Sequence, residues 1–507
     1  MALLLTRNCM SPLLHAAGRL AIAGGLLAVP LLATGQNAFS PGGNDFKIAG
    51  ALAGDQTAPH AAVGPTGGYL VWQDNAVTTN GLRIRAERLG SSLAQSQAPF
   101  AVSANAGSAT AGDQENPQVA LLKDGGAVFV WQGGKFGFQK IYARFRDAAG
   151  SFTTGDILVN TYTNSFQINP AVATLADGSV MVVWSSDGAD GEMQGIFGQR
   201  FSAAGAKLGG EFQVNQWVYK NQRTPAVAAL ANTNFVVAWI SELQRSAASV
   251  DVYARVFNGS GEAVGGEFLV NTTITNLCAN PTVAGSPDGG FAVAWSHKND
   301  LARGVADAVN GVPVTPRSPN GWDVFGRLFN ANGTATGPAI RLNTQRYGDQ
   351  FAPKISAFGK NYLAVWVSLG QDTSREGIFG QFLKSNGDLE GVEFRINTTT
   401  ISRQIHPVVA TDGLNRFLVA WSSFGAGTSF DLFARSYDLI RLTMAATAQG
   451  AVLSWNTQPG LVYLVQTSRS GTAWSNVGAA RTAGGHSDSI AVNAADGSAL
   501  YRVLRLQ

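Results

Sequence analysis

Few side chains in this sequence have the types and spacing that catalysis or ligand binding requires. After the first 35 residues the histidines are His60, His297, His406 and His486, and no pair has the spacing of metal ligands. No nucleophile elbow, zinc-protease motif or phosphate-binding glycine loop occurs, so no catalytic residue is predicted. His60 and His406 each adjoin a proline that opens a strand in the first and last copies of a repeat. We expect these two histidines to meet and regard both as ligand-binding candidates.

The clearest departure from the repeat is an insertion at residues 296–323. It supplies five further ligand-binding candidates: His297, Asp300, Arg303, Asp307 and Trp322. Three prolines would stiffen a loop that covers or lines the mouth of a channel, and binding residues are common on such loops. A tolerated surface insertion is the alternative, and the sequence favours neither interpretation.

Two acids in the third repeat lie in a segment with the composition of a calcium loop. Asp187 and Asp190 are each followed closely by glycine in residues 187–192, and carboxylates are ligands that calcium prefers. The segment lacks the spacing and the final glutamate of an EF-hand. A solvated turn is therefore favoured over a metal site, and calcium is the one cofactor that the sequence leaves open.

These candidates lie on a repeat of about 50 residues that occurs seven times, the period of a propeller blade. In each copy a proline opens the first strand and a tryptophan ends the second, at nearly constant spacing. The pairs are Pro59 and Trp72, Pro117 and Trp131, Pro170 and Trp184, Pro225 and Trp239, Pro281 and Trp295, Pro353 and Trp366, and Pro407 and Trp421. A third strand follows in every copy and a fourth strand in six. Four short strands per copy predict a β-propeller.

The fourth strand that is missing after the seventh copy has its counterpart before the first copy, at residues 46–49. We expect this N-terminal strand to pair with residues 432–437 and to close the ring, which removes an open seam between sheets. Residues 439–507 break the period and have a different all-β pattern, typical of a small sandwich. The predicted fold class is all-β: a seven-bladed β-propeller at residues 46–438, closed by the N-terminal strand, followed by a C-terminal β-sandwich at 439–507.

Recurrent residues of the repeat are better explained by packing than by function. The tryptophans end apolar strands and are expected to fill the space between sheets. A glutamine three residues before the proline is expected to bond backbone groups where one blade leads to the next, and a glutamine ring around the channel is the alternative. These glutamines are Gln56, Gln114, Gln167, Gln222, Gln350 and Gln404. The third-strand arginines are expected to connect blades: Arg144, Arg255, Arg327 and Arg435. Polar residues before five prolines favour a polar channel mouth: Asn116, Asn169, Thr224, Asn280 and His406.

Residues 1–35 have the pattern of a signal peptide, with two arginines, a short apolar run and small residues before Gln36. We therefore expect a secreted or periplasmic protein without a membrane span. The net charge of +3 provides no basic field for nucleic acid. Cys278 is the single cysteine after this segment, so no internal disulfide is expected, and we expect a monomer whose partner is an extracellular glycan or protein.

Two parts of the chain resemble known protein families. PAVATLADGSVMVVW at residues 170–184, GIFGQRF at 195–201 and EFQVN at 211–215 resemble the blade repeats of exported bacterial proteins. That resemblance covers residues 46–437 and implies a propeller, but it supplies no catalytic residues. The tail, with LSW at 453–455 and YRV at 501–503, is similar to the fibronectin type III-like tails of secreted proteins from Verrucomicrobia-type bacteria, which implies a spacer or an attachment module.

Because no catalytic motif is present, the sequence favours an exported, non-catalytic binding or scaffold protein. Its propeller loops would bind a glycan, a peptide or a cell-surface partner. The alternative is a polysaccharide-active hydrolase or lyase with acidic residues at the channel mouth: Asp187, Asp190, Asp300 and Asp307. A glycoside hydrolase requires two carboxyl groups about 5 to 9.5 Å apart across one cleft.

Overall fold

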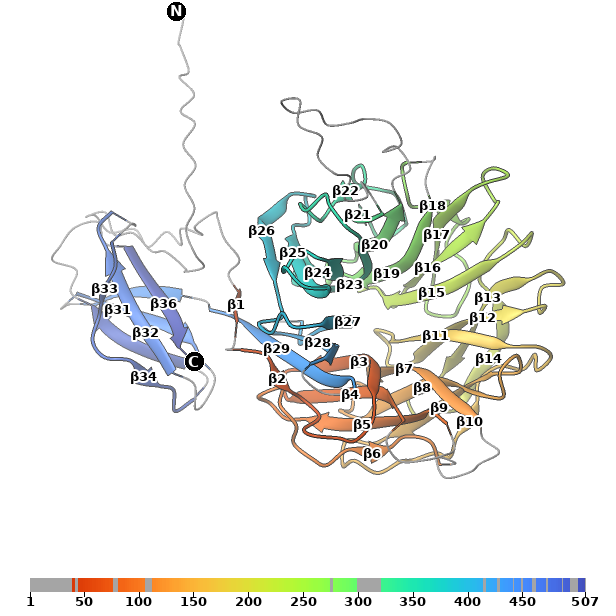
Figure 1. Cartoon of the computed structure of the whole chain (residues 1–507), viewed down its shortest axis with the longest axis horizontal. Coiled ribbons are helices and arrows are strands. Elements are labelled where there is room, and N and C mark those ends of the chain that lie inside the picture. The colour runs from red at the N-terminus through yellow and green to blue at the C-terminus, as the bar shows by residue number, and fades with distance from the viewer. Residues whose placement is uncertain are drawn as a thin grey trace, which may run out of the picture. The chain divides into compact units, whose positions relative to one another are not determined.

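The computed structural model of the chain describes residues 39–41, 44–75, 81–104, 112–273, 277–298, 321–413, 416–425, 429–440, 442–447, 450–457, 462–470, 473–485, 487–492 and 500–506. The chain divides into two compact units, Gly43–Tyr437 and a smaller one that combines Met1–Gly42 with Asp438–Gln507 (Figure 1). The expected signal peptide lies outside the described residues. Within the described part of the chain there is no helix that is long and apolar enough to cross a membrane.

The larger unit is built from antiparallel sheets of four strands, as the repeat predicts. The first three sheets are β3 (Gln56–Gly64), β4 (Gly67–Asp74), β5 (Arg83–Leu89) and β6 (Phe100–Ala101); β7 (Asp113–Leu121), β8 (Ala127–Gly134), β9 (Lys140–Arg146) and β10 (Ile157–Leu158); and β11 (Gln167–Thr174), β12 (Val180–Asp187), β13 (Gln194–Phe201) and β14 (Lys207–Gln213). The next three are β15 (Gln222–Ala229), β16 (Phe235–Glu242), β17 (Val250–Phe257) and β18 (Phe268–Leu269); β19 (Cys278–Gly285), β20 (Phe291–Lys298), β21 (Trp322–Phe329) and β22 (Ile340–Arg341); and β23 (Gln350–Phe358), β24 (Asn361–Leu369), β25 (Glu376–Leu383) and β26 (Leu389–Arg395). This arrangement is that of propeller blades.

The last sheet of the larger unit combines strands from both ends of that unit. It contains β27 (Arg403–Thr411), β28 (Arg416–Phe424) and β29 (Asp431–Leu439), and β2 (Phe46–Lys47) pairs with β29. Phe46 lies opposite Ala434 and Lys47 opposite Phe433. The N–H of Ile48 then donates to the carbonyl oxygen of Leu432 at 3.1 Å. The strand pairing expected for residues 46–48 is therefore present.

The sheets of the larger unit surround a common centre, and the first strand of each sheet lies innermost (Figure 1). Each first strand contacts the first strand of the next sheet, from β3 through β7, β11, β15, β19 and β23 to β27, and β27 in turn contacts β3. The centre is thus lined by residues at equivalent positions of the first strand of every sheet.

Apolar second strands fill the space between neighbouring sheets. All seven repeat tryptophans are at most 1% exposed, so their predicted role in the core is confirmed. One hydrophobic cluster, for example, combines Val128 and Phe145 of the second sheet with Val182 and Trp184 of the third. A strand covered on both faces can be apolar at consecutive positions, which explains the runs that precede each tryptophan.

The repeated glutamines bond the junctions between sheets, as predicted. Gln167 Nε2 donates to the carbonyl oxygen of Asn164 at 3.0 Å, and its Oε1 accepts from Asn160 Nδ2 at 3.2 Å. Asn160 Oδ1 accepts from the N–H of Ile141 at 2.8 Å, which connects the junction to the preceding sheet. The same glutamine contacts recur at Gln222, Gln350 and Gln404. The alternative of a glutamine ring around the channel is wrong.

The third-strand arginines connect neighbouring sheets, also as predicted. Arg255 Nη1 donates to the carbonyl oxygen of Val214 in the preceding sheet at 3.0 Å, and its Nε donates to that of Gly265 at 3.0 Å. The corresponding contacts across the junction are made by Arg144, Arg327 and Arg435. These guanidinium groups are structural, and they do not form an anion site.

The smaller unit contains two sheets with a shared core. One sheet consists of β30 (Leu442–Thr447), β31 (Gly450–Asn456) and β35 (Ser487–Val492), and the other of β32 (Val462–Ser468), β33 (Ser475–Asn476), β34 (Arg481–Thr482) and β36 (Leu500–Leu506). β1 (Phe39–Pro41) also falls in this unit. Leu453, Trp455, Tyr463 and Val503 belong to one buried cluster that includes residues of both sheets.

Candidate functional site

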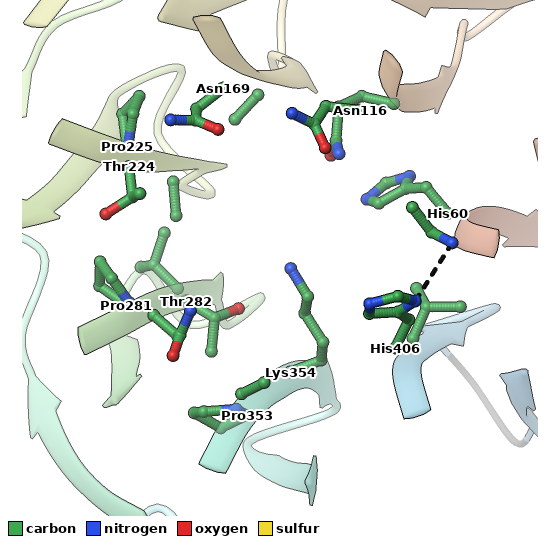
Figure 2. Close-up of a pocket in the computed structure, with 18 of the residues that line it drawn as sticks. His60, Asn116, Asn169, Thr224, Pro225, Pro281, Thr282, Pro353, Lys354 and His406 are labelled. Atoms are coloured by element: carbon green, nitrogen blue, oxygen red, sulfur yellow. Dashed lines mark hydrogen bonds between the residues drawn. The ribbon is translucent and has the colours of Figure 1, made fainter. Parts of the chain in front are cut away.

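A cavity of about 420 Å³ lies where the first strands of the larger unit converge (Figure 2). Each first strand contributes the same short stretch, centred on its proline. The contributing stretches are residues 58–60, 116–118, 169–172, 224–227, 280–283, 352–355 and 406–409. All five polar residues expected at the channel mouth line this cavity.

A bulge at the same position of every first strand shapes the wall of the cavity. In the third sheet, Asn169 and Pro170 of β11 stand opposite one residue of β12, because the register shifts between Ile168 and Ala171. The residue before the proline has a positive φ in all seven strands, from 48° at Ala58 to 54° at Asn169. A left-handed conformation costs an ordinary L-residue about 1–2 kcal/mol, so the surrounding structure must hold each bulge in place.

Hydrogen bonds from the neighbouring sheet hold these bulges. The N–H of Asn169 donates to Gln132 Oε1 at 2.8 Å, and the N–H of Thr224 donates to Ser185 Oγ at 3.1 Å. The acceptor in both cases directly follows the tryptophan of the preceding sheet, and the same contact occurs at Asn116 and Ala352. The wall of the cavity is therefore rigid before any ligand binds.

Lys354 is the strongest chemical feature of the cavity. Its side chain extends from β23 into the middle of the space (Figure 2). Water in the cavity can reach the Lys354 side chain. The protein that surrounds the cavity nevertheless partly desolvates the ammonium group, and this desolvation lowers its pKa. No aspartate or glutamate is found among the described lining residues. Because no carboxylate there stabilises the charged form, Lys354 can supply a neutral amine more readily than a lysine on the open surface of a protein.

The two histidines beside Lys354 are neutral hydrogen-bond donors. His60 Nδ1 accepts from the N–H of Val119 at 3.2 Å, and burial, with a smaller effect of Lys354, lowers its pKa to about 3. His406 Nδ1 accepts from the N–H of Ala58 at 3.5 Å (dashed line in Figure 2). Burial also lowers the pKa of His406, with smaller effects of Lys354 and Arg403. With Nδ1 accepting in each ring, the proton of the neutral imidazole is on Nε2.

The structure brings together His60 and His406 but not the candidates of the insertion. His297 is 2% exposed on β20, with Nδ1 3.7 Å from Cys278 Sγ and its ring 4.9 Å from that of Phe325. Burial lowers the pKa of His297, which Asp323 and Asp251 partly oppose. Trp322 begins β21, where its N–H donates to Asp349 Oδ1 at 3.0 Å. Neither residue lines the cavity.

The remaining candidates also lie elsewhere. Asp300, Arg303 and Asp307 fall outside the described residues. Asp187 accepts a hydrogen bond from Ser165 Oγ at 2.5 Å, and Asp190 Oδ1 accepts from the N–H of Glu192 at 3.2 Å. Burial raises the pKa of Asp190. In the described part of the chain no three acidic, histidine or cysteine side chains are grouped as a metal site would require, and the calcium site stays a prediction.

Sequence reasoning missed Lys354, although the repeat contained a signal for it. The residue directly after the proline lines the cavity in all seven sheets, and it is polar in four of them: His60, Gln118, Thr282 and Lys354. At this position a lysine and a histidine stand where three other copies have alanine or valine. Of the residues beside these prolines, only His60, after Pro59, and His406, before Pro407, were expected to bind a ligand.

No family model and no curated protein matches the chain. Among solved structures, the polysaccharide lyase Uly1 is similar at 11% identity and a TM-score of 0.46, over 74% of this chain and 90% of that one. An α-L-arabinanase of Penicillium chrysogenum is 15% identical with a TM-score of 0.43, over 64% and 93%. A protein of unknown function from Dyadobacter fermentans is 10% identical with a TM-score of 0.44, over 64% and 94%.

These comparisons correct the main expectation from the sequence. The non-catalytic binding or scaffold protein is contradicted, because the solved structures found are mainly glycoside hydrolases and a polysaccharide lyase. Likeness at this level of identity concerns the fold. The chemistry of this chain therefore has to be argued from its own cavity.

Proposed function

We propose that the chain is a lyase that cleaves an acidic polysaccharide by β-elimination in the central cavity. One observation supports this most directly: Lys354, whose pKa burial lowers, projects among neutral N–H donors in a cavity without a described carboxylate. The cavity volume of about 420 Å³ lies within the usual range for small-ligand sites, roughly 300–1,000 Å³.

The lining residues favour elimination over hydrolysis. Retaining and inverting glycosidases both require a pair of carboxyl groups across the cleft. Asp187 and Asp190, the described acids expected at the channel mouth, do not line the cavity. Elimination from a uronic acid requires no carboxyl pair. It requires a base for the proton next to the sugar carboxylate and hydrogen-bond donors for that carboxylate.

Each requirement has a residue in the cavity. The neutral amine of Lys354 would take the proton from the carbon that bears the carboxylate. The electron pair left behind forms the carbon–carbon double bond, and the glycosidic carbon–oxygen bond at the next carbon breaks. The leaving oxygen takes a proton from the new Lys354 ammonium group. The Nε2–H groups of His60 and His406 would bind the carboxylate, which gains negative charge as the proton leaves.

The test is cleavage of a panel of uronate-containing and neutral polysaccharides by the purified full chain. We expect the uronates to yield products with a new conjugated double bond, detected by ultraviolet absorbance, and the neutral polymers to stay intact. New reducing ends without a double bond would show hydrolysis and overturn the proposal.

Two substitutions of Lys354 distinguish a general base from a residue that only supplies a positive charge. Lys354→Met should lower kcat by about 10²–10⁴, the usual effect of removing a general base. Lys354→Arg keeps the charge but remains protonated, so it should be equally inactive. For the wild type, kcat should rise with pH through the Lys354 pKa, which lies below 10.5. An active Lys354→Arg variant would contradict the assignment of the base.

We also propose the finer architecture that the repeat suggests. The seven sheets would form a seven-bladed ring that β2 closes, and the smaller unit would be a fibronectin type III-like sandwich. Contact between β27 and β3 and the pairing of β2 with β29 support the closed ring. Residues 1–35 would direct the chain out of the cytoplasm as a signal peptide.

A further inference from the structure

One edge of the larger unit carries all of its exposed aromatic rings among the described residues. In an antiparallel sheet of four strands, the turn between the second and third strands lies at the edge where the first strand begins. The connections between sheets therefore open on this edge, which we call the entry edge. The bulges occur at the third or fourth residue of the first strands, so the cavity lies closer to the entry edge than to the opposite one.

The exposed rings belong to three segments on different sheets. Phe136 and Phe138 lie between β8 and β9, Trp217 and Tyr219 between β14 and β15, and Tyr347 between β22 and β23. Their exposed fractions reach 92% at Phe136 and 58% at Tyr347. At the opposite edge the large apolar side chains that are exposed, such as Val264, are aliphatic.

A lysine or arginine adjoins the rings in every one of these segments. Lys135 precedes Phe136, Lys220 follows Tyr219, and Arg346 precedes Tyr347. No ion pair of these three cations is found in the described structure. The Lys220 ammonium lies 5.0 Å from the centre of the Tyr219 ring, so the cation and the ring form one surface. An exposed ring beside an unpaired cation suits a sugar ring that carries an acidic group.

The segment between β14 and β15 is a rigid platform. The N–H groups of Gln216 and Trp217 donate to the Glu267 carboxylate at 2.6 and 3.1 Å, and Asn215 Nδ2 donates to the carbonyl oxygen of Trp217 at 2.7 Å. The Trp217 and Tyr219 rings stand edge to face, 6.4 Å apart and at 89°. Because the backbone is held, the rings lose little freedom when a ligand binds.

We propose that the entry edge binds an extended acidic polysaccharide outside the cavity, with its main platform at Trp217, Tyr219 and Lys220. Sugar rings stack on the aromatic faces, and the acidic groups pair with Lys220, Lys135 and Arg346. This inference rests on the proposed function, since the same polymer would enter the cavity at Lys354. Lysine is depleted at protein–protein interfaces, which makes a protein occupant less fitting.

The experiment measures binding and cleavage separately. Binding of long acidic chains and of short oligosaccharides from the same polymer is measured by calorimetry in a Lys354→Met background, which prevents turnover. Adding Trp217→Ala and Tyr219→Ala should weaken long-chain binding by about tenfold or more, equivalent to about 1.4 kcal/mol, because two stacking surfaces are lost. Binding of the shortest oligosaccharides should not change.

Controls make the outcomes distinct. Val264→Ala at the opposite edge should not affect binding, and Lys220→Glu should weaken binding most at low salt. The substituted side chains of the entry edge and of Val264 are at least partly exposed, so the melting temperatures of these variants should match that of the Lys354→Met protein. Unchanged long-chain binding in the double variant, or equal binding of a neutral polymer, would overturn the surface proposal. An active Lys354→Met enzyme would overturn the lyase proposal alone and leave the binding result intact.

Discussion

Glu87 of β5 occupies the register position that Gln199 has in β13 and Gln381 in β25. Each glutamine donates from Nε2 to two backbone carbonyl oxygens, at 2.9 and 3.2 Å for Gln199. An ionised glutamate has no proton to donate. Glu87 is 0% exposed, neither of its oxygens has a described hydrogen-bond partner, and burial raises its pKa to about 8. At neutral pH the residue is therefore protonated in the folded protein.

This residue predicts a pH dependence of stability. In the unfolded chain Glu87 ionises near its ordinary pKa of 4.5, and in the folded chain near 8. The folded state holds the proton more tightly, so stability is full below pH 4.5 and falls as pH rises toward 8, by roughly 5 kcal/mol. In Glu87→Gln this loss should disappear, as measured by urea unfolding across that range. Exposed Glu192→Gln serves as the control, and equal pH slopes in wild type and Glu87→Gln would contradict the prediction.

At the scale of elements, an acid in or just before the fourth strand connects several sheets to the sheets that precede them. Glu267 accepts from the N–H of Gln216 at 2.6 Å, and Glu393 accepts from the N–H of Thr344 at 2.5 Å. Asp45, directly before β2, accepts from the N–H of Thr398 at 3.0 Å in the same manner. β2 therefore makes the contacts of a fourth strand, since it pairs with β29 and the adjoining Asp45 bonds the preceding junction at Thr398. It does so although it comes from the other end of the unit in sequence.

The role of β2 predicts the effect of removing it. Deleting residues 36–50 should lower the melting temperature sharply, because β29 keeps β28 but loses its pairing with β2. Ile48→Ala should lower the free energy of unfolding by about 2–5 kcal/mol, since Ile48 is 1% exposed in the cluster that holds Trp72 and Leu418. Leu158→Ala, on an exposed fourth-strand position, is the matched control. A deletion variant with the same melting temperature as the wild type would rule out a closing role for β2.

At the scale of the whole molecule, the two units have separate hydrophobic cores. The buried cluster around Trp455 and Tyr463 contains residues of the smaller unit, whereas the other clusters draw on the sheets of the larger one. The cavity is lined entirely by the larger unit.

Separate cores predict that the tail is dispensable for catalysis. A chain that ends at Tyr437 should retain kcat on short acidic oligosaccharides within about twofold, because no cavity residue is lost. Thermal unfolding and the rate of double-bond formation in the full and shortened chains provide the measurement. A shortened chain that folds but is inactive would place part of the site in the smaller unit.

Strand positions were predictable from the sequence because they depend on local chemistry. Proline cannot donate to a sheet and tryptophan needs a large buried space, so the pairs from Pro59 and Trp72 onward mark the same two positions in every copy. The glutamine and arginine contacts at the junctions follow from the same periodicity.

The candidate site was only partly predictable because it depends on a backbone detail. A lysine after a proline resembles a solvated residue until the positive φ of 52° at Ala352 is known. His297 was assigned to the insertion, but β20 continues through Lys298, and pairing with Asp323 holds His297 inside the sheet packing. The binding or scaffold function was wrong because it relied on the lack of motifs, and a site assembled from seven strands leaves no contiguous motif.

The hydrogen bond between His406 and the N–H of Ala58 has a consequence for biosynthesis. His60 comes from the first sheet, Lys354 from the sixth and His406 from the last. A ribosome must therefore complete nearly the whole unit before these groups can meet. A truncated or half-synthesised chain has no assembled site, so the proposed lyase would be inactive until its last sheet joins its first.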